Sequence, residues 1–249
     1  MFTKILLASW LFVGSLHGGT ITIAVAANVS YAMDELKKEF IKHHPDTKIE
    51  VVLGSSGKLT AQIKNGAPYG LFMAADMKYP QRLYADGVAT TKPLLYAQGG
   101  LAMFSSKTID FSKGLELLKS PTISKIAIAN PQTAPYGVAA MEAMKNANVL
   151  SSVEKKFVFA ESIAQTVSYA ITAADIGFIA KSSLYSPNMS AYKENIHWVS
   201  VDSKLYTPID QGVVMLKNGE NNSEVVAFYN FILSPKAKAI LEKFGYIVP

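Results

Sequence analysis

Polar side chains occur in this sequence at four places where an apolar, strand-like run ends and a helical pattern begins. These places are Asn28, Ser56, Tyr136 and the pair Ser162-Ile163. The first amides of a helix lack partners within the helix, and its positive end attracts anions. Amides and hydroxyls that are fixed in place can hold a small dianion without a positively charged side chain. The chemistry that these residues predict is therefore the binding of an oxyanion.

Helix capping is the simpler interpretation for each of these residues alone. Asn and Ser are preferred at the N-cap, where the side chain accepts a hydrogen bond from the first turn of the helix. The turn Gly54-Ser55-Ser56-Gly57 fits such a cap at Ser56. The four places all follow strands, however, and parallel strands end at one edge of a sheet, where ligands bind. Their recurrence favours a shared site at that edge.

A secreted serine hydrolase is the enzymatic alternative, with Ser56 as its nucleophile. The turn around Ser56 lacks the spacing of a nucleophile elbow, and no histidine of the mature chain lies in a comparable loop. The phosphate-binding pattern Gly-X-X-X-X-Gly-Lys-Ser/Thr does not occur, and no pair of carboxylates stands at strand ends. We therefore expect no catalytic residue, no cofactor and no enzymatic activity.

The N-terminal segment has the composition of a secretory signal peptide. Lys4 precedes the apolar run Ile5–Val13, which is too short to span a bilayer, and the small residues Gly14-Ser15 and Gly18-Gly19 follow. The sequence contains no cysteine, which excludes disulfides, a thiol nucleophile and a lipid anchor at the end of the signal. The net charge of +5 is spread over scattered lysines, which argues against nucleic acid as a partner. We expect a cleaved signal peptide over residues 1–19 and a soluble periplasmic protein.

Hydrophobic periodicity predicts an α/β protein. Strands and helices alternate along the first part of the chain, which indicates a parallel sheet covered on both faces. The clearest predicted helices span residues 31–44, 136–147, 223–233 and 235–244. The clearest predicted strands span residues 49–53, 71–74, 101–104, 125–130, 157–160, 175–180 and 212–216.

Two crossings of the chain between lobes are predicted. Glycines flank the apolar run that follows Tyr96, and Tyr206-Thr207-Pro208 marks a second change of pattern. The chain thus divides into a first lobe of residues 20–97 and 205–249 and a second lobe of residues 98–204. A domain interrupted by another has two hinge strands, and its ligand cleft lies between the lobes. The expected fold is two α/β lobes with largely parallel sheets, joined by two hinge crossings.

A set of motifs, in this order along the mature chain, resembles the periplasmic molybdate-binding proteins of ABC transporters. They are Ala26-Ala27-Asn28, Gly54-Ser55-Ser56-Gly57, Asn65-Gly66-Ala67-Pro68, Ala74-Ala75-Asp76, Ala134-Pro135-Tyr136-Gly137 and Asp175-Ile176-Gly177-Phe178. The resemblance implies a type II periplasmic-binding fold that captures molybdate or tungstate between two lobes. It also implies delivery to a membrane permease that works with a cytoplasmic ATPase. The receptor itself would be a monomer whose only metal is that of the bound oxyanion.

The resemblance implies oxyanion contacts at six positions of this chain. They are Asn28, Ser56, Tyr136 and Ile163, with Ala27 and Ala75 as backbone donors. Ala180 stands where many members have a tyrosine, and Tyr136 stands where they have a small residue. The phenol that donates to the oxyanion would therefore have moved to another strand end. A further departure is Gly70, which replaces the aspartate that usually follows the Gly-Ala-Pro motif.

Other oxyanions are the alternatives within the class of binding proteins. Phosphate keeps a proton near neutral pH and needs an acceptor, whereas the predicted site has donors and no carboxylate. Sulfate is a fully ionised tetrahedral acceptor like molybdate, and the sequence does not measure the size of a cavity. A sulfate receptor therefore remains open at this point.

Overall fold

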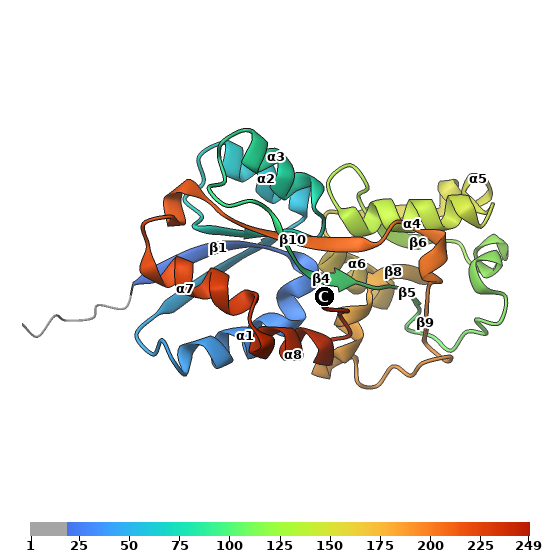
Figure 1. Ribbon diagram of the computed structural model, residues 1–249. Helices are drawn as coiled ribbons and strands as arrows, with labels where there is room; N and C mark the ends of the chain where they lie inside the picture. Colours follow the sequence, from blue (N-terminus) through green and yellow to red (C-terminus); the bar gives the residue numbers. More distant parts are fainter. Residues whose placement is uncertain (1–18) are drawn as a thin grey trace, which may run out of the picture.

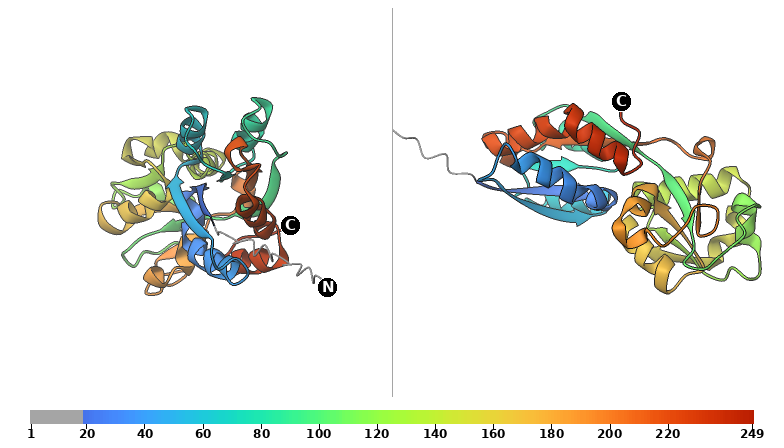
Figure 2. Two further views of the ribbon diagram at one scale, coloured as in Figure 1. Left: turned by 90° about the vertical axis from the view of Figure 1, so that its left-hand side faces the viewer. Right: turned by 90° about the horizontal axis from the view of Figure 1, so that it is seen from below.

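The computed structural model describes residues 19–249 and contains two five-stranded sheets joined by two crossings of the chain (Figure 1). We call each sheet, with the helices that cover it, a lobe, and the lobes lie side by side when seen from below (Figure 2). The predicted signal peptide lies, up to residue 18, outside the described residues. None of the helices in the described part of the chain has the length and apolar character that a membrane span needs.

The first lobe is built from both ends of the chain. Its strands, in the sheet order β2-β1-β3-β10-β4, are β1 (Thr20–Ala26), β2 (Lys48–Gly54), β3 (Leu71–Met73), β4 (Leu94–Gly99) and β10 (Ile209–Met215). Its helices are the 3-10 turn η1 (Ala27–Val29), α1 (Ser30–Ile41), α2 (Ser56–Lys64), α3 (Lys78–Ala85), α7 (Ser223–Ile232) and α8 (Pro235–Lys243). The early strand β1 is parallel to β2 and β3, whereas β10 runs antiparallel between β3 and β4.

Alternating side chains along β1 show how this sheet is covered on both faces. Ile23 and Val25 pack in the cluster formed with α1, α7 and α8, whereas Ala24 between them packs with α2 and α3 (Figure 1). Because both faces are buried, the strand is apolar throughout rather than alternating between apolar and polar residues.

The second lobe is formed by one continuous stretch of chain. Its strands, in the sheet order β7-β6-β8-β5-β9, are β5 (Leu101–Phe104), β6 (Ile126–Ala129), β7 (Phe157–Ala160), β8 (Ile176–Ala180) and β9 (Trp198–Ser200). Its α-helices are α4 (Pro135–Asn146), α5 (Leu150–Val153) and α6 (Ile163–Thr172). Helix α4 covers the face of Met103 and Phe178, and α6 covers the face of Ala102 and Ile179. Strand β6 is parallel to β7 and β8, and β5 is antiparallel to β8 and β9.

The two crossings between the lobes are tied to each other. Strand β4 passes into β5 through Gly100, and residues 201–208 lead from β9 back to β10. The Leu101 amide at the first crossing donates to the Tyr206 hydroxyl of the second at 3.2 Å. The C-terminal end of the chain lies against the strand of the first crossing, where Ile247 pairs with Gln98 of β4. Strand β4 continues past the predicted border at residue 97, and the predicted limits of the lobes stay a prediction.

The predicted α/β fold class is confirmed. The parallel ladders are those of strands connected through helices, and the antiparallel ladders involve the strands next to the crossings. The helix predicted over residues 31–44 spans Ser30–Ile41 and is preceded by η1, which was not predicted. This short turn is the element that places the first of the candidate site residues.

Candidate functional site

One small cavity between the lobes is lined by all six residues that were singled out from the sequence. Its atom-free space, with the open solvent at its mouth included, is about 190 Å³. The lining residues are Ala26, Ala27, Asn28, Gly54, Ser55, Ser56 and Ala75 of the first lobe, and Ala134, Pro135, Tyr136 and Ile163 of the second. These lining residues, all within the described part of the chain, are uncharged. The cavity therefore offers neutral polar groups and apolar surface.

Asn28 reaches the cavity because β1 ends in the tight turn η1. The Ser30 hydroxyl donates to the carbonyl oxygen of Ala27 at 2.7 Å and holds this turn. Asn28 itself is completely buried. Its Nδ2 donates to Oε1 of Gln211 at 2.8 Å and to the hydroxyl oxygen of Tyr246 at 2.9 Å. Its Oδ1 has no partner among the described residues, so the amide is satisfied at one end only.

Ser56 is the first helical residue of α2 rather than its cap. The N-cap is Ser55, whose side chain makes no capping hydrogen bond. The Ala75 amide donates to Oγ of Ser56 at 2.9 Å. A hydroxyl that accepts this bond still has its own hydrogen to donate. Ser56 can therefore donate to a ligand, whereas the Ala75 amide, expected to be a direct donor, is engaged with Ser56.

Tyr136 and Ile163 lie in the first turns of α4 and α6. Pro135 begins α4, and Ser162 caps α6 by accepting from the Gln165 amide at 3.3 Å. A helix leaves the amides of its first turn without partners in the helix. The main-chain N–H groups of Tyr136 and Ile163 can therefore serve a ligand, and Ser162 has the capping role that the simpler interpretation gave it.

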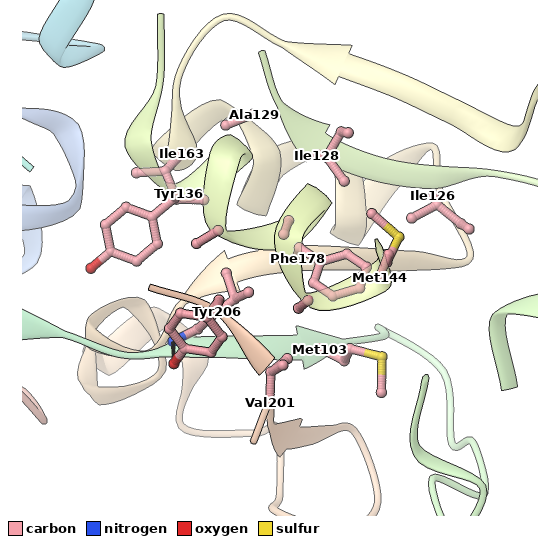
Figure 3. Packing of buried hydrophobic residues seen from close by; sticks show 14 of the residues in the cluster. Met103, Ile126, Ile128, Ala129, Tyr136, Met144, Ile163, Phe178, Val201 and Tyr206 are labelled. Atoms are coloured by element: carbon pink, nitrogen blue, oxygen red, sulfur yellow. Dashed lines mark hydrogen bonds between the residues drawn. The ribbon is translucent and has the colours of Figure 1, made fainter. Parts of the chain in front are cut away.

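The phenol of Tyr136 extends toward the first lobe. Figure 3 shows its ring beside Ile163 and directed away from the other labelled core residues of the second lobe. Its hydroxyl oxygen accepts from Nε2 of Gln211 at 3.3 Å, and a β-carbon on Gly99 would lie only 2.1 Å from it. Burial raises the pKa of the Tyr136 hydroxyl well above its ordinary value. The hydroxyl is therefore a neutral donor that faces the strands of the crossings.

A buried network of hydrogen bonds next to the cavity was not predicted. The Tyr96 hydroxyl also donates to Oε1 of Gln211, at 2.9 Å. The Tyr246 hydroxyl and Oγ of Ser182 donate to the carbonyl oxygen of Asn28 at 2.8 and 2.9 Å. The available sequence signal was weak: Gln211 is a polar residue within the largely apolar run of β10, where it is fully buried.

The two departures from the family differ in how the structure accounts for them. At Gly70, a β-carbon would lie 2.7 Å from Cγ2 of Val225 and 3.4 Å from Cα of Gly219. An aspartate there would collide with α7, so glycine follows from packing in this chain. Ala180 at the end of β8 is fully buried and does not line the cavity.

A wider hollow, of about 680 Å³ with open solvent included, adjoins the cavity and shares three of its lining residues. Unlike that of the cavity, its lining includes charged side chains, namely Asp76, Lys78 and Glu142. Burial raises the pKa of Asp76 to about 6, against the opposing effects of a hydrogen bond from the Tyr79 amide and of the charge on Lys78. Charged groups thus lie beside the neutral cavity but not in it.

Direct contacts hold the two lobes together around the cavity. The Gly57 amide of the first lobe donates to the carbonyl oxygen of Thr133 in the second at 2.9 Å. Lys58, the next residue, forms an ion pair with Glu161 of the second lobe. The lobes are therefore in direct contact at the start of α2.

Comparison with known proteins places the chain in a family. Residues 21–247 match the family described as bacterial extracellular solute-binding protein. The molybdate-binding protein ModA of Azotobacter vinelandii is 33% identical over 231 residues, which are 91% of this chain and 89% of that protein. ModA of Rhodobacter capsulatus is also 33% identical, over 92% of this chain and 88% of that protein.

Solved structures give the same result. The periplasmic molybdate-binding protein of Azotobacter vinelandii matches with a TM-score of 0.84 and 31% identity, over 92% of this chain and 99% of that one. The sulfate-binding protein SubI of Mycobacterium tuberculosis has a TM-score of 0.73 at 14% identity, and it shares the fold alone.

Two lobes joined by two crossings, with a cavity of neutral polar groups between them, are the features of a receptor that encloses a small solute. The chain belongs to the bacterial extracellular solute-binding protein family, in which it is similar to the molybdate-binding proteins over nearly its whole length.

Proposed function

We propose that this protein is the periplasmic receptor of a molybdate importer and that it binds molybdate or tungstate between its lobes. The observation that supports this most is the convergence of Asn28 and Ser56 with the helix starts at Tyr136 and Ile163 on one neutral cavity. The similar proteins from two organisms are molybdate-binding proteins, which points to the ligand.

Neutral donors hold the dianion in this proposal. The Ser56 hydroxyl donates because its oxygen already accepts from the Ala75 amide, so Ala75 acts through Ser56. The main-chain amides of Tyr136 and Ile163 donate from two helix starts, and Ala27 adds a main-chain contact from η1. Hydrogen bonds to a charged acceptor are the stronger kind, each contributing about 1.5 to 3 kcal/mol.

The proposed role in transport is that of a periplasmic receptor for an importer in the membrane. A signal over residues 1–19 directs the chain to the periplasm, where the monomer passes its oxyanion to a membrane permease driven by a cytoplasmic ATPase. No catalytic residue takes part. A general esterase assay tests the enzymatic alternative, because turnover that is lost in Ser56→Ala would establish a serine hydrolase instead.

Calorimetric titration of the mature chain with molybdate, tungstate, sulfate and phosphate tests the proposed ligand. Molybdate and tungstate should bind, and phosphate should not, because its proton needs an acceptor. Phosphate binding as tight as that of molybdate would contradict a site made of donors. Tighter binding of sulfate than of molybdate would make the protein a sulfate receptor.

Thermal unfolding gives an independent check. Ligand at a hundredfold excess over its dissociation constant stabilises the folded state by about 2.7 kcal/mol. For a chain of this size, that is a rise in melting temperature of roughly 5 to 10 °C. Molybdate should produce the rise and phosphate should leave the melting temperature unchanged.

A further inference from the structure

We propose that Gln211 is a positioning residue that decides which end of the Asn28 side-chain amide faces the bound oxyanion. The inference rests on the proposed function, because it concerns the same cavity. Gln211 is fully buried on β10 and is not among the residues that line the cavity. It contacts both lobes, since its Oε1 accepts from Nδ2 of Asn28 at 2.8 Å and its Nε2 donates to the Tyr136 hydroxyl oxygen at 3.3 Å.

The amide orientation in the structure gives Asn28 the wrong polarity for a dianion. Its two Nδ2 hydrogens are directed to Gln211 and to the hydroxyl oxygen of Tyr246. The opposite end, Oδ1, is a buried acceptor with no partner among residues 19–249. A carboxamide oxygen repels an oxyanion, whereas the nitrogen of the same group would donate to it.

Turning both amides corrects this polarity and keeps the heavy atoms of the network in place. The two ends of a carboxamide are nearly equal in size but opposite in hydrogen-bonding role. After the turn, Nε2 of Gln211 donates to Oδ1 of Asn28, and Oε1 of Gln211 accepts from the Tyr136 hydroxyl. Nδ2 of Asn28 then faces the cavity, so the direction of every hydrogen bond from Asn28 to Tyr136 is reversed.

The neighbouring hydroxyls can follow the reversal. The Tyr96 hydroxyl, which donates to Gln211, has a main-chain carbonyl oxygen 3.4 Å away to which its hydrogen can turn. The Tyr246 hydroxyl can turn its hydrogen from the Asn28 carbonyl oxygen to Oδ1, because Oγ of Ser182 also donates to that carbonyl, at 2.9 Å. With the oxyanion accepting from Nδ2 of Asn28, every buried polar group of the network then has a partner.

This arrangement explains why a glutamine occupies the position. Its side chain carries a donor and an acceptor at one end, so it can serve either direction of the network, which an apolar or purely accepting side chain cannot. Because Gln211 lies on the strand that follows the second crossing, the polarity of the site is linked to the hinge and to Tyr136 of the second lobe.

A double-mutant cycle with molybdate as the ligand tests the proposal. Gln211→Met keeps the length of the side chain and removes its hydrogen bonds. We expect it to raise the dissociation constant for molybdate by about tenfold when Asn28 is present. In an Asn28→Ser background, where a hydroxyl has no fixed polarity, the same change should have an effect within about twofold. Gln98→Met, on the neighbouring hinge strand, is the matched control and should leave affinity unchanged.

The outcomes separate this inference from the proposed function. If the wild-type protein does not bind molybdate, both are overturned. If it binds and Gln211→Met changes affinity equally in both backgrounds, or not at all, the role of Gln211 alone is overturned. Nuclear magnetic resonance of the wild-type protein needs no substitution: the side-chain amide signals of Gln211 and Asn28 should both move on saturation with molybdate. An unmoved Gln211 signal would also contradict the proposal.

Discussion

The main-chain amide of Gly57 in the first lobe donates to the carbonyl oxygen of Thr133 in the second at 2.9 Å. A β-carbon on Gly57 would lie 2.9 Å from Cα of Thr133 and 2.6 Å from the hydroxyl of Tyr79. Neighbours at such distances would have to shift. Glycine at this position therefore permits the close approach of the lobes next to Ser56 of the cavity.

We expect Gly57→Ala to weaken molybdate binding by about tenfold, because the added methyl group hinders the approach of the two lobes. A tenfold change in affinity corresponds to about 1.4 kcal/mol. The ligand-free melting temperature should change little, since the added methyl meets main-chain atoms only in the other lobe and, within its own lobe, the end of the Tyr79 side chain. Calorimetry measures the affinity, and small-angle scattering should show less compaction on adding molybdate than in the wild type. Wild-type affinity in Gly57→Ala would show that closure does not depend on this contact.

Tyr136→Phe separates two roles of the phenol. If the hydroxyl acts through Gln211, the change removes one neutral hydrogen bond of about 0.5 to 1.5 kcal/mol, and the dissociation constant for molybdate should rise roughly 2- to 10-fold. Direct donation to the dianion would instead contribute about 1.5 to 3 kcal/mol, with a rise of up to about 150-fold. We expect the smaller effect, because the hydroxyl lies at Gln211 and Gly99. Titration calorimetry decides between them.

Asp76 should make the protein less stable as the pH rises from about 4 to 6. Burial raises its pKa from 3.8 to about 6 in the folded protein, so the folded state binds more protons than the unfolded chain in this range. The free energy of unfolding therefore falls as the carboxyl ionises. Asp76→Asn should remove this fall and raise the free energy of unfolding at neutral pH by up to about 3 kcal/mol. Urea unfolding of both proteins across this pH range measures the difference, and parallel curves would contradict it.

Gly70→Asp should destabilise the folded protein, because the new β-carbon would lie 2.7 Å from Val225. Such overpacking costs about 1 to 3 kcal/mol. In a Val225→Ala background, the same substitution should cost clearly less, because the colliding methyl groups are absent. Urea unfolding of the two single variants and the double variant gives the coupling between the two sites. Strictly additive effects would mean that the collision with Val225 is not the cause.

Local sequence signals predicted which residues line the cavity, but they did not predict which hydrogen bonds these residues make. Asn28 and Ser56 stand at recognisable helix starts, and the alternation of strands and helices brought those starts to one edge of each sheet. The bonds from Asn28 to Gln211 and to Tyr246 join residues 183 and 218 positions apart, and no local pattern indicates such a pairing. Only the folded chain shows that the Ala75 amide donates its hydrogen bond to Ser56.

Packing explains the rest of what the sequence did not reveal. The reason for Gly70 lies in Val225, a residue of a helix near the other end of the chain. The N-cap of α2 is Ser55 and not Ser56. A pattern of apolar residues does not locate the start of a helix to within one residue.

The place of β10 in the first sheet also fixes the order in which a growing chain can complete its parts. Every strand of the second lobe lies before residue 201, whereas β10 begins at Ile209 and fills the position between β3 and β4. The first lobe, which contains the N-terminal strands, is thus the last to be completed. Until β10 arrives, β3 and β4 present unpaired edges, which are templates for pairing with other chains. A nascent or truncated chain that stops before residue 209 therefore combines a complete second sheet with an open, association-prone first one.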